Sequence, residues 1–164
     1  MLDYFSGLLT AFRSYYFYIL KEYNRMPRQF NTYLWNIGKQ IEDELLPKIN
    51  NAFNADFKRS SDIFDILDFK DDIKKQIVEV KGRRNTSTQY NDTIITVGKV
   101  TESLMEIERG YDVYFFFVFT DKTMFIKVES DFEYPVKLTG TNNIPHYLIP
   151  VKDLIEFDEN NFLD

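Results

Sequence analysis

Residues 78–83 of this chain read Val-Glu-Val-Lys-Gly-Arg, and the interpretation of the whole sequence starts from this short stretch. Side chains alternate between the two faces of a β-strand, so Glu79 and Lys81 share one face while Val78 and Val80 share the other. Burying a carboxylate and an ammonium group costs free energy unless each has a partner. The pattern therefore indicates either a structural salt bridge or a site where both groups act together.

A second apolar run that carries acidic side chains precedes this stretch. Residues 63–69 read Ile-Phe-Asp-Ile-Leu-Asp-Phe, with Asp65 in the middle. If a loop joins this run to the strand at 76–83 as a hairpin, Asp65 is expected to lie roughly opposite residues 79–81. An aspartate facing a Glu-x-Lys strand is the layout of a metal-dependent phosphodiesterase, so Asp65 is the expected metal ligand.

Two neighbouring aspartates compete with Asp65 for this role. With a loop at 70–75, the expected pairing places Asp68 nearer residue 77 and leaves only Asp65 within reach of the Glu-x-Lys pair. Asp62 and Asp68 are therefore expected to be ordinary surface residues, and an exposed Asp65 on an edge strand stays open as an alternative.

The composition limits the possible chemistry. The chain has 164 residues, enough for one globular domain with a core but not for two full domains. It has no cysteine, which excludes a disulfide scaffold, a cysteine-based zinc site and a thiol nucleophile. His146 is the single histidine and is expected to be structural. The remaining metal ligands are carboxylates, which favour Mg²⁺ or Mn²⁺.

The charge pattern bears on partners. A net charge of −6 argues against non-specific coating of nucleic acid but allows a local basic rim. Basic residues gather around the motif, at Lys74, Lys75, Lys81, Arg83 and Arg84. No apolar run approaches the length of a membrane span, and no signal peptide is visible at the N-terminus. We therefore expect an intracellular protein, not secreted and without membrane contact.

Apolar periodicity predicts helices in the first third of the chain. One covers 3–24 and ends at Met26-Pro27, and another starts at about Arg28 and continues past Pro47, which kinks it or splits its last turn. Strands are expected at 55–60, 63–69 and 76–83, followed by a polar loop at 84–91.

The second half of the chain is expected to begin with a helix capped by Asp92 or Thr93 and ended by Gly110. Strands at 113–119 and 123–128, a loop-rich segment at 131–145, a strand at 146–149 and a short helix from Pro150 follow. The predicted fold is an α/β domain over residues 28–164, with helices flanking a mixed central sheet. An N-terminal helical extension, residues 1–27, is available for a homodimer or a protein partner.

This order of elements resembles the PD-(D/E)XK nuclease superfamily, the restriction-endonuclease-like fold, over roughly residues 37–128. Within that range three stretches are similar to predicted nucleases of large DNA viruses: FDILDF at 64–69, VEVKGR at 78–83 and QYNDTIITVGK at 89–99. One departure is Phe64, which stands where the superfamily has a proline before the aspartate.

The resemblance implies a Mg²⁺- or Mn²⁺-dependent nuclease, an endonuclease with DNA favoured over RNA, in the cytoplasm or nucleus of a host cell if viral. Asp65, Glu79 and Val80 would hold the cation, and Lys81 would orient the attacking water. Glu42, on the preceding helix, would supply a carboxylate for a second metal. The nucleic-acid contacts would come from Arg83, Arg84, Gln89, Tyr90 and Lys99.

Two other interpretations stay open. The first is a protein with the nuclease fold that has lost its activity and acts as a binding or scaffolding module through its N-terminal helix. The second is an unrelated α/β domain in which the motif arose by chance. Convergence of the Asp, Glu and Lys side chains favours the enzyme, and a wide separation favours the alternatives.

Overall fold

The computed structural model describes residues 31–59, 67–139 and 143–160. The predicted helix at 3–24 and two candidate aspartates, Asp62 and Asp65, lie outside these ranges. The chain divides into two compact units, residues 1–34 and 35–164, whereas the sequence had placed the boundary after residue 27. The second unit carries the predicted motif.

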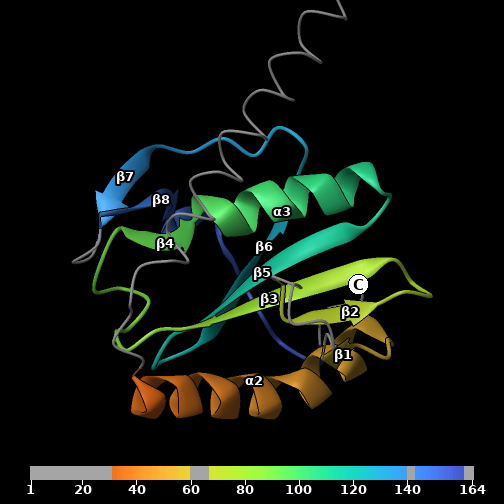
Figure 1. The fold of residues 1–164 in the computed structure, drawn as a ribbon. Coiled ribbons are helices and arrows are strands. Elements are labelled where there is room, and N and C mark those ends of the chain that lie inside the picture. The colour runs from red at the N-terminus through yellow and green to blue at the C-terminus, as the bar shows by residue number, and fades with distance from the viewer. Residues whose placement is uncertain (1–30, 60–66, 140–142, 161–164) are drawn as a thin grey trace, which may run out of the picture. The chain divides into compact units, whose positions relative to one another are not determined.

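A six-stranded mixed sheet forms the centre of this unit, in the order β1-β2-β3-β5-β6-β9 (Figure 1). Strands β3 and β5 run parallel, and every other neighbouring pair in this sheet is antiparallel. The predicted mixed central sheet is therefore confirmed. The strands are β1 Lys58–Arg59, β2 Phe69–Asp71, β3 Gln76–Gly82, β5 Asp112–Val118, β6 Thr123–Val128 and β9 Ile155–Glu156.

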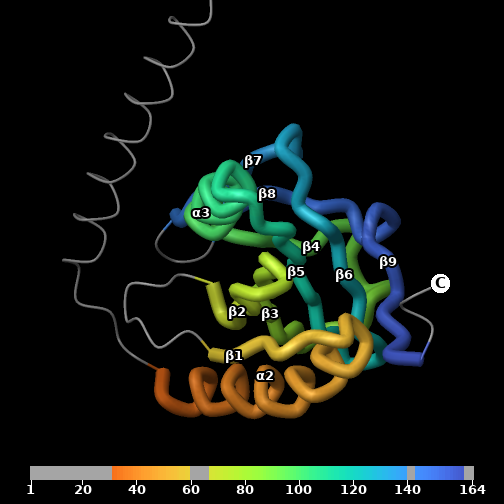
Figure 2. Tube along the Cα trace, turned by 90° about the vertical axis from the view of Figure 1, so that its right-hand side faces the viewer, coloured from red at the N-terminus to blue at the C-terminus, as the bar shows by residue number. Residues whose placement is uncertain are grey.

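Two α-helices cover the two faces of the central sheet, as Figures 1 and 2 show from two directions. Helix α2, Thr32–Phe53, packs its buried residues against Val78 and Val80 of β3. Helix α3, Val97–Glu108, packs on the other face, where Ile77 belongs to a second apolar cluster. Because side chains alternate along a strand, Glu79 faces the α3 side.

The start of α2 follows from its capping residue. The Asn31 side chain accepts a hydrogen bond from the Leu34 backbone N–H at 3.1 Å, which satisfies one of the unpaired donors of the first turn. The helix begins at Thr32 rather than near Arg28, and it continues through Pro47 to Phe53.

A small second sheet has the order β4-β8-β7, with β4 Asp92–Thr96, β7 Val136–Thr139 and β8 Ile144–Pro150. The prediction that Asp92 or Thr93 caps a helix is wrong, because this segment is β4. The cap is Thr96, whose Oγ1 accepts a hydrogen bond from the Lys99 backbone N–H at 3.4 Å.

The C-terminal third also differs from the prediction. Strand β7 lies in a segment expected to be loop, and β8 begins two residues earlier than the expected strand at 146–149. The helix expected from Pro150 is a single 3₁₀ turn, Val151–Asp153, followed by the short edge strand β9. None of the helices within the described ranges is both long enough and apolar enough to span a bilayer.

Candidate active site

The β2–β3 hairpin decides which aspartate meets Glu79. In this hairpin Phe69 lies opposite Val78, and the connecting turn covers only residues 72–75. Continuing the register by one residue places Asp68 opposite Glu79. Directly opposite residues of an antiparallel pair point to the same face, so Asp68 and Glu79 both face α3.

The expected position of Asp68 near residue 77 is therefore wrong. The expectation assumed a loop over 70–75, but β2 extends to Asp71 and the turn is two residues shorter, which moves Asp68 toward Glu79. Asp65 lies outside the described residues, and its role as a metal ligand stays a prediction from the sequence.

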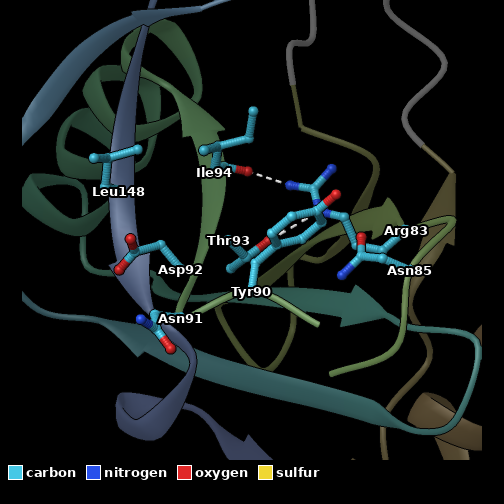
Figure 3. A pocket seen from close by; sticks show the side chains of 8 residues that line it. All are labelled: Arg83, Asn85, Tyr90, Asn91, Asp92, Thr93, Ile94 and Leu148. Carbon is cyan, nitrogen blue, oxygen red and sulfur yellow. Dashed lines mark hydrogen bonds between the residues drawn. The ribbon is translucent and has the colours of Figure 1, made fainter. Parts of the chain in front are cut away.

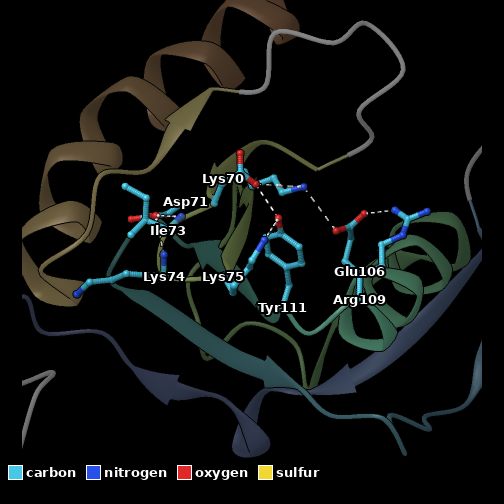
Figure 4. Close-up of polar contacts among 9 residues, drawn as sticks. Lys70, Asp71, Ile73, Lys74, Lys75, Glu106, Arg109 and Tyr111 are labelled. Carbon is cyan, nitrogen blue, oxygen red and sulfur yellow. Dashed lines mark hydrogen bonds and ion pairs between the residues drawn. The ribbon is translucent and has the colours of Figure 1, made fainter.

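Asp71 explains why the turn is short. Its carboxylate accepts backbone hydrogen bonds from Ile73 and Lys74 at 2.9 Å and from Asp56 at 2.8 Å. Figure 4 shows Asp71 beside Ile73 and Lys74 at the end of β2. These donors hold the pKa of the Asp71 carboxyl below its ordinary value, so Asp71 stays ionised and fastens the turn.

Asp68 is joined to β3 by its own hydrogen bond. Its Oδ2 accepts from the Val80 backbone N–H at 2.8 Å. This contact fixes one oxygen of Asp68 beside the residue that separates Glu79 from Lys81. The sequence named Asp68 only as a competitor, and the signal that could have identified it is the turn-forming role of Asp71.

Glu79 is the most unusual residue of the site, because it is fully buried in the middle of β3. Lys99 of α3 places its Nζ 2.7 Å from Glu79 Oε2, and Lys81 places its Nζ 3.5 Å from Oε1. Within the described residues no donor hydrogen-bonds to Oε1. Glu79 Oε2 is thus paired with the Lys99 ammonium group, whereas Oε1 can still accept a hydrogen bond.

Burial raises the pKa of the Glu79 carboxyl to about 7. The Lys99 and Lys81 charges lower this pKa, while the Asp68 carboxylate raises it. The sign of the net shift means that burial outweighs the two lysines. A cation that replaced the lost water shell would favour the ionised form.

Glu42 is not brought to this group. Its carboxylate pairs with the Arg59 guanidinium, which also contacts Asp43 at 2.8 Å, on the α2 side of the sheet. Helix α2 packs against the face opposite to Glu79. Glu42 is therefore paired with Arg59 rather than placed beside Glu79, and its expected role as a ligand of a second metal stays a prediction from the sequence.

Arg83, expected to contact nucleic acid, makes several contacts within the protein. Its Nε donates to Thr93 Oγ1 at 2.9 Å, and its Nη2 donates to the Ile94 carbonyl oxygen. Burial lowers the pKa of this guanidinium to about 10, and the group lies 5.3 Å from the centre of the Phe117 ring. Two of the three guanidinium nitrogens therefore connect the end of β3 to β4, and contact of Arg83 with phosphate stays a prediction.

The loop after β3 carries the other predicted contacts. Arg84, Gln89 and Tyr90 are exposed, and Gln89 Nε2 donates to the Tyr90 hydroxyl at 3.2 Å. The loop is anchored by Ser87, whose N–H and hydroxyl both donate to the Asp121 carboxylate at 2.7 Å. This anchor leaves Gln89 and Tyr90 on the surface beyond it.

A second polar cluster ties the hairpin to the far end of α3. Lys70 Nζ lies 4.3 Å from the centre of the Tyr111 ring and 3.6 Å from Glu106 Oε2 (Figure 4). The Tyr111 hydroxyl donates to Asp72 at 2.6 Å. These contacts brace β2 against α3. His146 lies in the second sheet, with its Nδ1 within hydrogen-bond distance of the Thr139 hydroxyl and the Ile144 carbonyl oxygen.

Comparison with known proteins identifies no relative of this chain. No protein-family model matches the chain, and no curated protein or solved structure matches it.

Proposed function

We propose that this protein is a divalent-metal-dependent nuclease of the PD-(D/E)XK type, in which Asp68, Glu79 and Lys81 act together. The observation that carries the proposal is the fully buried Glu79 carboxylate, opposite Asp68 and between two lysines. Burying such a charge costs free energy, and a strand that served only stability would seldom carry a charged group at a buried position.

The topology supports the same class. An antiparallel hairpin leads into β3, and a helical crossover, α3, leads from β3 to the parallel strand β5. With α2 before the hairpin, the order is helix, strands, helix, strand, which is the order that the resemblance implies. The likeness in the order of elements and the likeness in the motif are independent of each other, and both support the proposal.

The donors fit a small hard cation. Mg²⁺ commonly uses one or two carboxylates, with water and substrate phosphate oxygens filling the other positions. Asp68 and Glu79 would supply the carboxylates, and the Val80 carbonyl would add a backbone oxygen. Glu79 Oε1 accepts no hydrogen bond from the described residues, so its lone pairs are available to a cation, and this observation favours the fit. A bound cation would activate a water molecule and offset charge on the phosphate.

The two lysines have separate tasks. Lys99 holds Glu79 Oε2 from α3, which orients the carboxylate and favours its ionised form. Lys81 is partly exposed and lies next to Oε1, so its ammonium can orient the attacking water and stabilise negative charge on the phosphate in the transition state. Lys99, expected from the sequence to contact phosphate, is thus proposed as a positioning residue.

One observation favours a second candidate function. Lys99 at 2.7 Å already compensates Glu79 without a metal, which is what a purely structural ion pair requires. In that case the protein is a binding or scaffolding module, and its fold keeps the motif only for stability.

The test is cleavage of plasmid DNA, single-stranded DNA and RNA by the purified protein. We expect hydrolysis in Mg²⁺ or Mn²⁺ and none in EDTA. Lys81→Ala should lower the rate by about a hundredfold or more while keeping the fold, because Lys81 touches the reacting groups rather than the core. Lys152→Ala, at an exposed lysine of the 3₁₀ turn, is the control. Cleavage in EDTA, or an undiminished rate in Lys81→Ala, contradicts the mechanism.

A further inference from the structure

A pocket of about 470 Å³ lies where β3 leads into the loop before β4 (Figure 3). Its volume is within the range of small-molecule sites in proteins. The residues that line it and matter here are Arg83, Asn85, Tyr90, Asn91, Asp92 and Leu148.

The pocket is close to the candidate active site. Arg83 follows Lys81 by two residues, and its guanidinium lies over Phe117, a residue of the apolar cluster on the α3 side. Lys81 and Arg83 therefore lie on the same face of the sheet, about 7 Å apart along the strand. A polymer strand that passes Lys81 can thus reach the pocket with its next unit.

The pocket is not built for phosphate. Arg83 already donates through Nε to Thr93 and through Nη2 to the Ile94 carbonyl oxygen, and the Asp92 carboxylate among the lining residues repels an anion. The pocket therefore suits a neutral group better than a charged one.

The other lining residues suit a flat, polar-edged group. Tyr90 is 60% exposed, so a large part of its ring is available for stacking. Figure 3 shows the Tyr90 ring in front of Arg83, with Asn85 to one side and Asn91 and Asp92 to the other. Amide and carboxylate groups hydrogen-bond to the edges of nucleobases, and Leu148 adds an apolar surface.

We propose that this pocket receives an unpaired nucleobase of the strand that the protein cuts, with Tyr90 as the stacking residue. The inference rests on the proposed function and narrows its substrate class to single-stranded or locally unpaired nucleic acid. A base inside a duplex is stacked and paired on both sides, so it enters such a pocket only after it is extruded.

The test measures binding of a fluorescent single-stranded oligonucleotide in EDTA, where no cleavage occurs, and of the matching duplex. Tyr90→Ala should weaken single-strand binding by about tenfold or more, because one stacked base is lost. Tyr90→Phe keeps the ring and should bind like the wild type. Tyr33→Ala removes a tyrosine that is 71% exposed and does not line the pocket, and serves as the matched control. Duplex binding should be the same in all four proteins.

An oligonucleotide with abasic sites separates base stacking from backbone contact. We expect the wild type to bind it as weakly as Tyr90→Ala binds the intact strand. Single-strand binding by Tyr90→Ala at wild-type strength, an equal loss on duplex, or no single-strand binding by the wild type would overturn the inference. Metal-dependent cleavage together with single-strand binding that does not depend on Tyr90 would contradict the base-binding pocket and support the proposed nuclease. Single-strand binding that depends on Tyr90, without cleavage of any substrate, would contradict the proposed nuclease and support the base-binding pocket.

Discussion

At the scale of single residues, the proposed site depends most on Glu79. The alternation of side chains along 78–83 was enough to predict that Glu79 and Lys81 share a face, and the 3.5 Å contact between them agrees with this. The sequence could not reveal that Lys99 lies closer still. That contact depends on how α3 packs over β3, which local periodicity does not determine.

The pH dependence of stability tests the burial of Glu79. A carboxyl whose folded pKa is raised to about 7 keeps its proton in the folded state after the unfolded chain has lost it, near the ordinary value of 4.5. Stability from this group is therefore present at low pH and is lost as pH rises through about 7. In EDTA, we expect the free energy of unfolding of the wild type to fall by about 2 kcal/mol relative to Glu79→Gln between about pH 5 and about pH 8.

Denaturant titrations of both proteins at the two pH values measure this difference. Glu133→Gln, at an exposed glutamate, should follow the wild type. A gap between wild type and Glu79→Gln that is the same at both pH values would mean that Glu79 titrates alike in the folded and unfolded states, against the buried position described above.

At the scale of elements, the β2–β3 hairpin decides which carboxylates meet. The sequence predicted β3, but the strand expected at 63–69 shares only Phe69 with β2, because Lys70 and Asp71 look like loop residues. Asp71 is instead a buried acceptor that ends β2 and folds the turn. An error of two residues in the turn was enough to place Asp68 near residue 77 instead of opposite Glu79.

Replacement of Asp71 should show how much the turn contributes. Asp71→Ala leaves three backbone N–H groups without their acceptor, and we expect a loss of about 2 kcal/mol in the free energy of unfolding near neutral pH. Asp131→Ala, at an exposed aspartate, should change stability by less than about 0.5 kcal/mol. Equal stability of the two variants would show that Asp71 does not fasten the hairpin.

The helix predicted from Asp92 illustrates a different kind of error. Ile94 and Val97 have helical spacing, but residues 93–97 read Thr-Ile-Ile-Thr-Val, and β-branched side chains favour strands. The composition of the segment therefore outweighed its period. Strand β7 was missed for another reason: Pro135, Gly140 and Pro145 around it are residues typical of loops.

At the scale of the whole molecule, the sequence was sufficient for the class of fold and for the position of the motif on a buried strand. Long apolar runs such as residues 113–119 identify the centre of the sheet, and helices on either side follow from their apolar faces. The division into a six-stranded and a three-stranded sheet was not predictable, since β4 pairs with β8, a strand far from it in the sequence.

We propose that Asp68 completes a metal-dependent site with Glu79 and Lys81, in the position for which the sequence favoured Asp65. The measurement that tests it most directly is the rate of nucleic-acid cleavage in Mn²⁺ by the wild type, Asp68→Asn and Asp65→Asn, with the fold of each variant checked by circular dichroism. We predict that Asp68→Asn loses about a hundredfold or more of the rate, because a metal-binding charge is removed, and that Asp65→Asn stays near the wild type. Full activity in Asp68→Asn together with its loss in Asp65→Asn would contradict the account.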